Sequence, residues 1–486
     1  MNVYEQVIEL AKRRGFFWPS YSIYGGESGF YDYGPLGVLL KDNVIRTWKE
    51  AYVSEGGIMI DTPVIVPESV FRTSGHIEKF SDLATECPKC HNREKLETVM
   101  KASGNENVIN DENQANEFLA ANTVKCVKCG TRITKAFESK QMFKIPDQVN
   151  SGNLYLRPET AQGIFVNFKL LNTVFRGKLP MAVAQLGKGF RNEISPRQGL
   201  LRMKELNMGE VEVFVIPDKK YWKELIAGDE IKLVPKTGPE VSSDVRSAFE
   251  KGIISSNAMA YFINKTYDIL KNVGIKHENI RFRQQHDDEL AHYSVDTWDA
   301  EALLDDSWVE VVGIADRNDL RKHQDATGES VSVKVDDADV IPSIIEPAYG
   351  IDRMVMSLLM NSFYTRENGF KVLRIPEKIA PYHAAVLPLV NKDGLDLLAK
   401  ELHEKLLLND PYVYFDQSGS IGKRYARQDE IGTPYCITLD HDSATEKTVT
   451  VRERDSTKQT RISMDSLIEY GIIGNPEIRK FRETLQ

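Results

Sequence analysis

Residues 181–215 read MAVAQLGKGFRNEISPRQGLLRMKELNMGEVEVFV, and this stretch decides the fold. Apolar and polar residues alternate from Met181 to Ile194 and again from Leu200 to Val215, with a short polar loop between the two runs. Alternation indicates strands with one buried face, and two such runs joined by a loop predict a long antiparallel hairpin. At 486 residues the chain can bury a real core around such a sheet and form two to four domains.

The predicted hairpin carries charged residues that need partners. Arg191 and Glu193 are two positions apart, so they lie on one face of a strand. The return run adds Arg202, Lys204, Glu205, Glu210 and Glu212. Such a face offers cations for phosphate groups and carboxylates for an ammonium group. By charge pattern alone, a solvated hairpin with cross-strand ion pairs is the simpler alternative.

Two further strings combine polar residues with a helix start. Residues 346–353 read EPAYGIDR between an apolar strand and a Met- and Leu-rich helix, where Gly350 permits close backbone approach and Arg353 can face a polyphosphate. Taken alone, this string is better explained by an ordinary strand-to-helix turn with Asp352 as N-cap. Residues 157–163 read RPETAQG, and Pro158 with Glu159 is also plain helix-start chemistry.

Four of the five cysteines form two Cys-x-x-Cys pairs, CPKC at 87–90 and CVKC at 126–129. Two turns that each present two thiolates can close a tetrahedral site, which is the arrangement of a structural Zn²⁺. The predicted zinc ligands are Cys87, Cys90, Cys126 and Cys129. Unpaired buried thiols and thiol redox chemistry are the alternatives. Cys436 falls in a predicted strand and is expected to be core.

The composition is that of an ordinary globular protein, with 41% hydrophobic and 27% charged residues. The 62 basic and 71 acidic residues give a net charge of −9, which argues against generic DNA coating and leaves nucleic-acid contacts to local patches. No apolar run approaches the ~18 residues that span a bilayer. The N-terminus lacks a signal-peptide pattern, so we expect a cytoplasmic protein without membrane association.

Changes of pattern divide the chain into segments. Residues 84–136 read as an insertion that holds the cysteine pairs, and residues 218–300 as a mixed helical insertion of uncertain role. A Pro-bracketed linker near 371–381 marks a boundary, after which strands and helices alternate as in a small α/β domain. We therefore predict one domain over 1–375 and a second over 376–486. The chain has no Gly-x-Gly-x-x-Gly string and no P-loop, so any ATP must be held another way.

Together these strings resemble the glycyl-tRNA synthetases of the homodimeric archaeal and eukaryotic type, which are class II aminoacyl-tRNA synthetases. The three class motifs match the predicted helix 38–53 with the strand that ends at Pro63, the hairpin that begins at 190–193, and residues 350–353. The strings typical of the glycine enzymes are YDYGPLG at 31–37, FRTSGH at 71–76, RPETAQG at 157–163 and Glu346-Pro347. The resemblance covers nearly the whole chain.

The resemblance implies an α+β fold: a class II antiparallel sheet flanked by helices, a zinc-ribbon-like insertion and a C-terminal α/β anticodon-binding domain. It implies that glycine and ATP give glycyl-adenylate, from which glycine passes to tRNA(Gly). The catalytic cations would be Arg191 and Arg353, acting with Mg²⁺, because attack on the α-phosphate needs positioning and charge dispersal. The implied ATP-binding positions are Arg191, Asn192, Glu193, Leu201, Arg202, Leu206, Glu310, Val311, Gly350 and Arg353.

The resemblance also implies the glycine-binding residues. Glu159, Glu210 and Glu346 would hold the ammonium group, while Arg72 and Arg317 would position the carboxylate. Ala348 stands where the family usually has a serine, and Leu206 where it usually has an aromatic residue that stacks on adenine. Because glycine has no side chain, selection becomes steric exclusion of a Cβ, and no editing domain is expected.

The remaining expectations concern the binding partners of the chain and two alternative functions. The implied partners are glycine, ATP, tRNA(Gly) and a second copy of the chain. Basic residues of the C-terminal domain are candidate phosphate contacts, namely Lys423, Arg424, Arg427, Arg452, Arg454 and Arg461. One alternative function is a non-catalytic, synthetase-like paralogue that binds nucleic acid or a partner. Another is a class II synthetase for serine, threonine, proline or another small amino acid.

Overall fold

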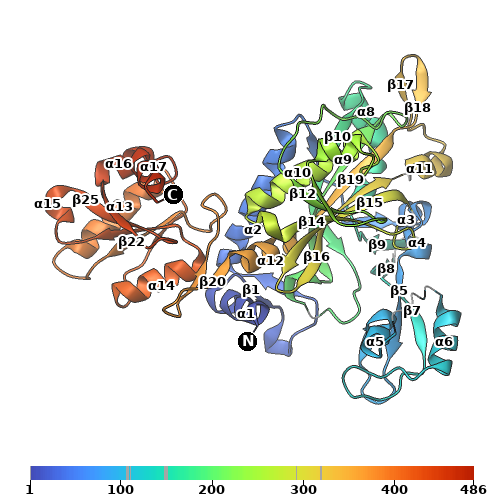
Figure 1. The fold of residues 1–486 in the computed structure, drawn as a ribbon, viewed down its shortest axis with the longest axis horizontal. Helices are drawn as coiled ribbons and strands as arrows, with labels where there is room; N and C mark the ends of the chain where they lie inside the picture. The colour runs from blue at the N-terminus through green and yellow to red at the C-terminus, as the bar shows by residue number, and fades with distance from the viewer. Residues whose placement is uncertain are drawn as a thin grey trace.

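The computed structural model describes residues 2–105, 109, 111–146, 152–196, 198–291, 293–317 and 320–485. It shows a larger body built on one wide sheet and a smaller C-terminal body beside it, drawn from orange to red in Figure 1. A light-blue to cyan unit, which includes α5, α6, β5 and β7, projects from the larger body. Within the described residues, no helix is long and apolar enough to cross a membrane.

The central sheet has nine strands among the described residues, in the order β13-β12-β14-β15-β16-β19-β11-β10-β3. Most neighbours are antiparallel, and only the pairs β3–β10 and β12–β14 within this sheet are parallel. The strands are β3 Ile58–Ile60, β10 Met181–Phe190, β11 Glu205–Val215, β12 Ile231–Val234, β13 Val241–Ser243, β14 Ile280–Gln284, β15 Ser294–Leu304, β16 Ser307–Arg317 and β19 Ser343–Gly350. The predicted antiparallel α+β fold is confirmed.

The hairpin predicted from residues 181–215 is β10–β11, paired from Met181 with Phe214 to Phe190 with Glu205. Its strands are shorter than the alternation suggested, because the connection contains the short 3-10 turn η2, Gly199–Leu201. Arg191 and Glu193 therefore lie in the connection just beyond β10, and not within a strand.

Three long helices cover one face of the sheet and bury its apolar side: α2 Pro35–Val53, α10 Asn257–Val273 and α12 Ile351–Ser362. Trp48 and Tyr349 are both fully buried there. The Tyr349 hydroxyl is hydrogen-bonded to the hydroxyls of Tyr52 (2.7 Å) and Thr266 (2.8 Å), so the core carries no penalty for that polar group. A Cβ at Gly37 would lie 1.7 Å from the Phe16 carbonyl oxygen, so the first turn of α2 needs a glycine at this position.

The opposite face of the sheet is only partly covered. Helices α7 Ala161–Phe165 and α8 Phe168–Val174 pack there against Met181, Val183 and Phe214. Side chains alternate along a strand, so residues two apart from these positions share their face. Glu210 on β11 and Glu346 with Ala348 on β19 therefore point to this open side, and the functional site is built on it.

Residues 218–300, expected to be a mixed helical insertion, contain α9 Val245–Glu250 and α10 but also the strands β12, β13 and β14 and part of β15. These strands form one edge of the central sheet, so the segment belongs to the main core. Strands of three to five residues, such as β12, β13 and β14, contain too few positions for alternation to stand out from the polar segments around them.

The cysteine-bearing segment folds as a unit with its own core. Its three strands are β5 Ser81–Glu86, β6 Arg93–Lys95 and β7 Ala136–Lys140, in the order β6-β5-β7. Helices α5 Leu96–Ala102 and α6 Glu112–Ala121 pack Leu96, Val99 and Leu119 against Ile133. The unit begins and ends within four residues of the predicted limits, 84–136.

The C-terminal body has a five-stranded sheet, β23-β22-β24-β25-β26, within the described part of the chain. Its elements are β22 Ala384–Pro388, α13 Leu395–Leu407, β23 Val413–Phe415, α14 Ile421–Ile431, β24 Tyr435–Leu439, α15 Ser443–Glu446, β25 Thr448–Glu453, β26 Gln459–Ser463, α16 Met464–Tyr470 and α17 Pro476–Glu483. Asp429 of α14 accepts from Arg366 (2.6 Å), and this contact joins the two bodies.

Smaller elements connect these parts. They are α1 Val3–Arg14, β1 Phe17–Pro19, η1 Ser22–Tyr24, β2 Tyr31–Tyr33, β4 Ile65–Pro67, α3 Glu68–Ser74, α4 His76–Lys79, β8 Lys144–Pro146, β9 Asn153–Leu156, η3 His277–Asn279, α11 Leu320–Thr327, β17 Val333–Val335, β18 Ala338–Val340, β20 Phe363–Thr365 and β21 Lys371–Leu373.

Candidate active site

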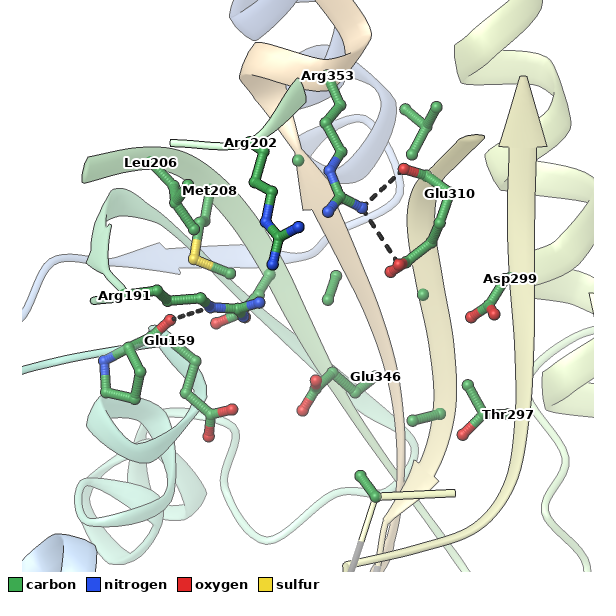
Figure 2. Close-up of a pocket in the computed structure, with 18 of the residues that line it drawn as sticks. Glu159, Arg191, Arg202, Leu206, Met208, Thr297, Asp299, Glu310, Glu346 and Arg353 are labelled. Atoms are coloured by element: carbon green, nitrogen blue, oxygen red, sulfur yellow. Dashed lines mark hydrogen bonds and ion pairs between the residues drawn. The ribbon is translucent and has the colours of Figure 1, made fainter. Parts of the chain in front are cut away.

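A cavity of about 530 Å³ opens on the uncovered face of the central sheet. Its floor is formed by β11, β15, β16 and β19, and its walls by the β10–β11 connection, α4 and the start of α12. Figure 2 shows guanidinium groups in the upper part of this pocket and the carboxylates of Glu159 and Glu346 in the lower part. Three guanidinium groups therefore gather at one end of the cavity, where Glu193 and Glu310 accompany them, and the carboxylates of Glu159 and Glu346 lie at the other end.

The cationic end is made by Arg191, Arg202 and Arg353. Arg353 donates from Nη1 to the backbone oxygen of Glu310 (2.8 Å) and from Nε to that of Leu201 (3.1 Å). Arg191 donates from Nε to the backbone oxygen of Pro158 (3.2 Å). Because backbone oxygens carry no full charge, these contacts hold the two guanidinium groups in place without neutralising them, although Arg353 also pairs with the Glu310 carboxylate.

Two carboxylates accompany this end of the pocket. Glu193 pairs with Arg202, with Nη2 2.7 Å from Oε2. Glu310 accepts from Arg353 at 3.2 Å, and its side chain is about half exposed. An apolar wall beside them consists of Leu206 and Met208, and Figure 2 shows both side chains projecting beside Arg202.

The acidic end contains three buried carboxylates and one buried cation. Glu159, Glu210 and Glu346 are at most 6% exposed, and Arg317 is fully buried. Arg317 pairs with Glu346 through Nη1 and lies 3.3 Å from Glu159 through Nη2. Glu210 instead accepts from Thr160, from its backbone N–H at 2.5 Å and from its hydroxyl. Arg157, which is buried nearby, also acts electrostatically on Glu210, so two guanidinium groups face three carboxylates and this end has a surplus of negative charge.

The pKa values of these carboxyls separate accordingly. Burial raises the pKa of Glu346 to about 8; Arg317 opposes the rise, and Glu210 and Glu159 reinforce it. Burial also raises the pKa of Glu210, and the neighbouring Glu159 adds to the effect. Burial acts on Glu159 in the same direction, but Arg317 and His76 outweigh it and hold its pKa well below the usual value. An added cation at this end would favour the ionised form of all three.

The structure brings most of the predicted site residues together. The cavity is lined by Glu159, Arg191, Glu193, Leu201, Arg202, Leu206, Glu210, Glu310, Val311, Glu346, Ala348, Gly350 and Arg353. Arg317 lies beneath it and reaches it through its two ion pairs. Asn192 is close in sequence but is not among the lining residues.

Arg72, predicted to position a carboxylate, does not reach this pocket. Its side chain is 59% exposed and pairs with Glu68 and with Glu78 (3.1 Å). Gly75, at φ +86°, separates helices α3 and α4 and turns the chain, so that His76 points inward and Arg72 outward. His76 lies 3.4 Å from Glu159 and is the residue of the FRTSGH string that the structure places at the site.

Other lining residues carried no recognisable signal in the sequence. Asp299 and Thr297 on β15 point into the cavity because Trp298 and Ala300 face the core. Burial, reinforced by Glu310, raises the pKa of Asp299 to about 7. Tyr293, just before β15, also lines the cavity. These positions lie within residues 218–300, the segment expected to be a mixed helical insertion.

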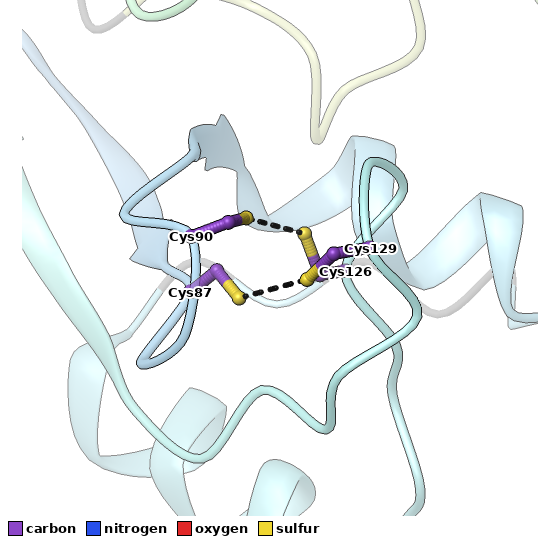
Figure 3. Close-up of side chains that lie close together, drawn as sticks. All are labelled: Cys87, Cys90, Cys126 and Cys129. Atoms are coloured by element: carbon purple, nitrogen blue, oxygen red, sulfur yellow. Dashed lines mark hydrogen bonds between the residues drawn. The ribbon is translucent and has the colours of Figure 1, made fainter.

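The four predicted zinc ligands converge in the projecting unit, as Figure 3 shows. Their sulfur atoms all lie within 4.8 Å of one another, with Cys87 and Cys129 3.5 Å apart and Cys90 and Cys126 3.7 Å apart. Both Cys-x-x-Cys segments have the same local geometry, because the first cysteine of each accepts a backbone hydrogen bond, from His91 (3.0 Å) and Gly130 (2.9 Å). Four unbridged thiols at this spacing fit a tetrahedral metal ion.

The candidate phosphate contacts of the C-terminal body differ from the prediction. Arg424, Arg452 and Arg454 are buried and support the fold. Arg452 forms a two-bond pair with Asp429 (2.9 and 3.0 Å), and Arg454 donates to the backbone oxygens of Ile375 and Gly432. Arg427 and Arg461 are paired with Asp416 and Asp440, and Lys423 is exposed. The sequence does not show whether a basic side chain has a hydrogen-bond acceptor beside it in the folded protein.

Two family models match the chain. One, described as a tRNA synthetase class II core domain (G, H, P, S and T), matches residues 143–232. The other, described as an anticodon binding domain, matches residues 383–472.

Curated relatives match over almost their whole length. A glycine–tRNA ligase of Methanothrix thermoacetophila is 36% identical, covering 96% of each chain. A glycine–tRNA ligase of Archaeoglobus fulgidus is 37% identical, covering 95% of each chain. One from Methanocaldococcus jannaschii is 36% identical, covering 96% of this chain and 98% of its own.

Solved structures share the fold at low sequence identity. Prolyl-tRNA synthetase of Giardia lamblia, in complex with prolyl-adenylate, superposes with a TM-score of 0.62 at 13% identity, over 99% of this chain and 79% of that one. A threonyl-tRNA synthetase structure from Cryptosporidium parvum gives a TM-score of 0.60 at 17% identity, over 97% and 98%. These likenesses support the class II fold.

Proposed function

The chain belongs to the glycine–tRNA ligase family, and from this premise we propose that it joins glycine to tRNA(Gly) in two steps at the cavity described above. In the first step a carboxylate oxygen of glycine attacks the α-phosphorus of ATP, and the bond to the bridging oxygen breaks to release pyrophosphate. In the second, a hydroxyl of the terminal ribose of tRNA attacks the glycyl carbonyl carbon, and AMP leaves.

The observation that carries this proposal is the separation of charge within one cavity. Three buried carboxylates lie at one end, where the buried Arg317 pairs with two of them, and Arg191 with Arg353 stands at the other. A substrate with an ammonium group at one end and a polyphosphate at the other fits this arrangement. An amino acid activated by ATP has those two charges.

The ammonium of glycine would lie among Glu159, Glu210 and Glu346, whose surplus charge it neutralises. Ala348 lines the same part of the cavity and pairs in register with Glu210. Arg72 is left out of this proposed set, because its guanidinium is committed to Glu68 and Glu78 at the surface. Arg317 would then be the cation nearest to the glycine carboxylate.

The phosphates of ATP would lie at Arg191 and Arg353, the proposed catalytic residues. In-line attack on phosphorus needs alignment of the reactants and dispersal of charge, and the protein need not supply a nucleophile. A guanidinium fixed by neutral backbone oxygens meets that need, because it needs little reorganisation when charge develops. Mg²⁺ bound with ATP would share the phosphate charge, as class II synthetases use ATP with Mg²⁺.

The adenosine would lie between the β10–β11 connection and the start of α12. Leu206 and Met208 offer an apolar face for the base, and the backbone at Val311 and Gly350 approaches closely enough to line the site. Glu193, which the resemblance assigns to the adenine amino group, is paired with Arg202 in this structure. Adenine bound at Glu193 would therefore either displace Arg202 or contact Glu193 while the ion pair with Arg202 stays in place.

The C-terminal body, assigned to residues 376–486, would read the anticodon arm of tRNA(Gly). Its match to an anticodon binding domain covers residues 383–472. Structural zinc held by the four cysteines is part of the same proposal, as is a cytoplasmic location, where charged tRNA is used.

We assign the homodimer contact to an apolar surface around α8. Leu170 and Val174 on α8 are 68% and 66% exposed, and Val166, which follows α7, is 51% exposed, so the three side chains offer exposed apolar surface beside α8. Ile65 is 47% exposed and shares with Val166 a mostly apolar cavity of about 140 Å³. Light scattering should give twice the chain mass for the wild type, and a shift toward the monomer for Leu170→Asp.

Pyrophosphate–ATP exchange with each of the twenty amino acids tests the function. We expect exchange with glycine alone and its loss in Arg191→Ala. Lys423→Ala, an exposed cation in the C-terminal body, is the control for a lost positive charge. Exchange with another amino acid would show a differently specified pocket, and none at all in the presence of tRNA would favour a non-catalytic paralogue.

A further inference from the structure

Four side chains at the acidic end of the cavity form a closed ring of contacts. His76 Nε2 lies 3.4 Å from Glu159, and Glu159 lies 3.3 Å from Arg317. The Arg317 guanidinium carbon lies 3.8 Å from the centre of the Tyr293 ring. The Tyr293 ring stacks back on His76, with centroids 6.3 Å apart and planes 26° apart. The four residues come from four separate segments: α4, the loop before α7, the end of β16 and the residues before β15.

Two members of this ring, Glu159 and Arg317, are already in the proposed glycine set. The other two, His76 and Tyr293, line the cavity, but the family resemblance gave them no role. His76 is 3% exposed, and so is held by its surroundings. His76 contacts Glu159, and Tyr293 contacts Arg317, so each can affect one member of that ion pair.

His76 is arranged to donate a hydrogen bond to Glu159. Its Nδ1 lies 2.7 Å from the Ser74 hydroxyl, which fixes the ring, and its Nε2 faces the carboxylate. An ionised carboxylate has no hydrogen to give, so the hydrogen in this contact belongs to Nε2. The contact therefore favours the ionised form of Glu159 and fixes the direction in which its second oxygen points.

Tyr293 covers the flat face of Arg317. A second ring contact comes from Phe165, whose ring centre is 5.1 Å from the same guanidinium carbon. A guanidinium in contact with two aromatic rings keeps its charge but loses rotational freedom, so its N–H groups stay directed at Glu159 and Glu346. Such a planar clamp resists a shift of either ion pair when a small ligand arrives.

We infer that His76 and Tyr293 are positioning residues for glycine binding: His76 holds Glu159 ionised and aimed at the ammonium, and Tyr293 holds Arg317 flat beneath it. This inference rests on the proposed glycine activation. A ligand with only two functional groups gives an enzyme few contacts, so small errors in the placement of Glu159 and Arg317 remove a large share of its binding.

Two matched pairs of variants separate the hydrogen bond from the ring. His76→Phe keeps an aromatic ring and removes the donor, whereas His76→Gln keeps an N–H donor and removes the ring. Tyr293→Leu removes the ring, and Tyr293→Phe keeps it. The assay is glycine-dependent pyrophosphate–ATP exchange, in which KM for glycine, KM for ATP and kcat are measured separately.

We expect KM for glycine to rise about tenfold or more in His76→Phe, the usual loss for a hydrogen bond to a charged group, with KM for ATP within about twofold of the wild type. His76→Gln should recover part of that loss. Tyr293→Leu should also raise KM for glycine, and Tyr293→Phe should recover most of it. Cooperative thermal melting of each variant shows that it is folded. If His76→Phe does not fold, Tyr293→Leu and Tyr293→Phe test the inference in its place.

Different outcomes contradict the proposed function and the present inference. A wild-type chain without glycine-dependent exchange contradicts the proposed function itself. If the wild type shows normal exchange, the present inference is overturned when His76→Phe and Tyr293→Leu both have a KM for glycine within about twofold of the wild-type value. It is also overturned if KM for ATP rises as much as KM for glycine, because a general loss of structure would then explain both.

Discussion

Arg317 and Glu346 form an ion pair in which the side chains are 0% and 5% exposed, across the neighbouring strands β16 and β19. A single buried pair of this kind gains little over apolar packing, because desolvation offsets the attraction. Here two more carboxylates, Glu159 and Glu210, crowd the same cation. Stability alone therefore does not account for this pair. The extra carboxylates around it allow the site to bind one more positive charge.

Glycine binding should depend on pH through Glu346. Burial raises its pKa to about 8, so the ionised form that accepts an ammonium is lost as pH falls through that value. We expect KM for glycine to rise as pH is lowered from 8.5 to about 6.5, with proton release on binding. In the glycine-free chain the same raised pKa makes the free energy of unfolding fall as pH rises toward 8.

Exchange assays across this pH range give KM for glycine, with KM for ATP as the internal control. Glu346→Gln removes the titrating group, so its KM for glycine should be higher and should lose this part of the pH dependence. A flat profile in the wild type would count against the assignment of Glu346.

A serine at position 348 should strengthen glycine binding. Ala348 lines the cavity, pairs in register with Glu210 and follows Glu346 by two positions on the same face of β19. Its replacement by serine adds one hydroxyl, worth about 0.5–1.5 kcal/mol as a net hydrogen bond, or about 2- to 10-fold in KM. Ala348→Cys has nearly the same size and only a weak donor, so it should change KM much less. Equal effects of both changes would point to packing instead.

An aromatic ring at position 206 should strengthen ATP binding. Leu206 lies on the apolar wall beside Arg202 (Figure 2), and a ring there can stack on a purine. A stacked pair contributes about 0.5–1.5 kcal/mol beyond burial, so Leu206→Phe should lower KM for ATP by about 2- to 10-fold. Leu206→Met is the control of similar volume. If KM for ATP is unchanged in both variants, the base does not lie on this wall.

The four-cysteine cluster should hold one zinc ion per chain. Its sulfurs are within 4.8 Å of one another, and the unit that carries them has only a small core. Metal analysis of the purified chain should give one equivalent, and Cys126→Ser should abolish tight binding because three ligands hold zinc less well. Cys436→Ser, a buried cysteine in the other body, is the control. Zinc content that is equal in both variants would contradict the site.

Asp429 should contribute strongly to stability where the two bodies meet. It is 2% exposed and accepts from Arg366 (2.6 Å) and from Arg452 (2.9 and 3.0 Å). Asp429→Asn leaves two cations without their counter-charge, and the loss from breaking a buried pair is about 3–5 kcal/mol. Asp440→Asn breaks the partly exposed pair with Arg461 and should cost about 1 kcal/mol or less. Urea unfolding of both variants compares them, and similar losses would show that burial is not decisive.

Local sequence was enough to predict the elements whose residues interact with near neighbours. The β10–β11 hairpin follows from alternation in residues 181–215, because a strand shows its buried face at every second position. The two Cys-x-x-Cys turns follow from their spacing, since each turn brings its own two sulfurs together. The three carboxylates at 159, 210 and 346 came from the family resemblance, and the structure places them together.

Only the tertiary structure decided which side chain of a string reaches the site. Arg72 and His76 are four residues apart in FRTSGH, but the turn at Gly75 sends one outward and the other to Glu159. Arg452 and Arg454 look like phosphate contacts until Asp429 and the Ile375 carbonyl are found beside them. The sequence by itself therefore determined the central hairpin, the cysteine site and the family, whereas charge pairing and burial came from contacts between segments that are separate along the chain. The physical reason is that a charge acts through its neighbours in space, and the chain's local pattern does not specify them.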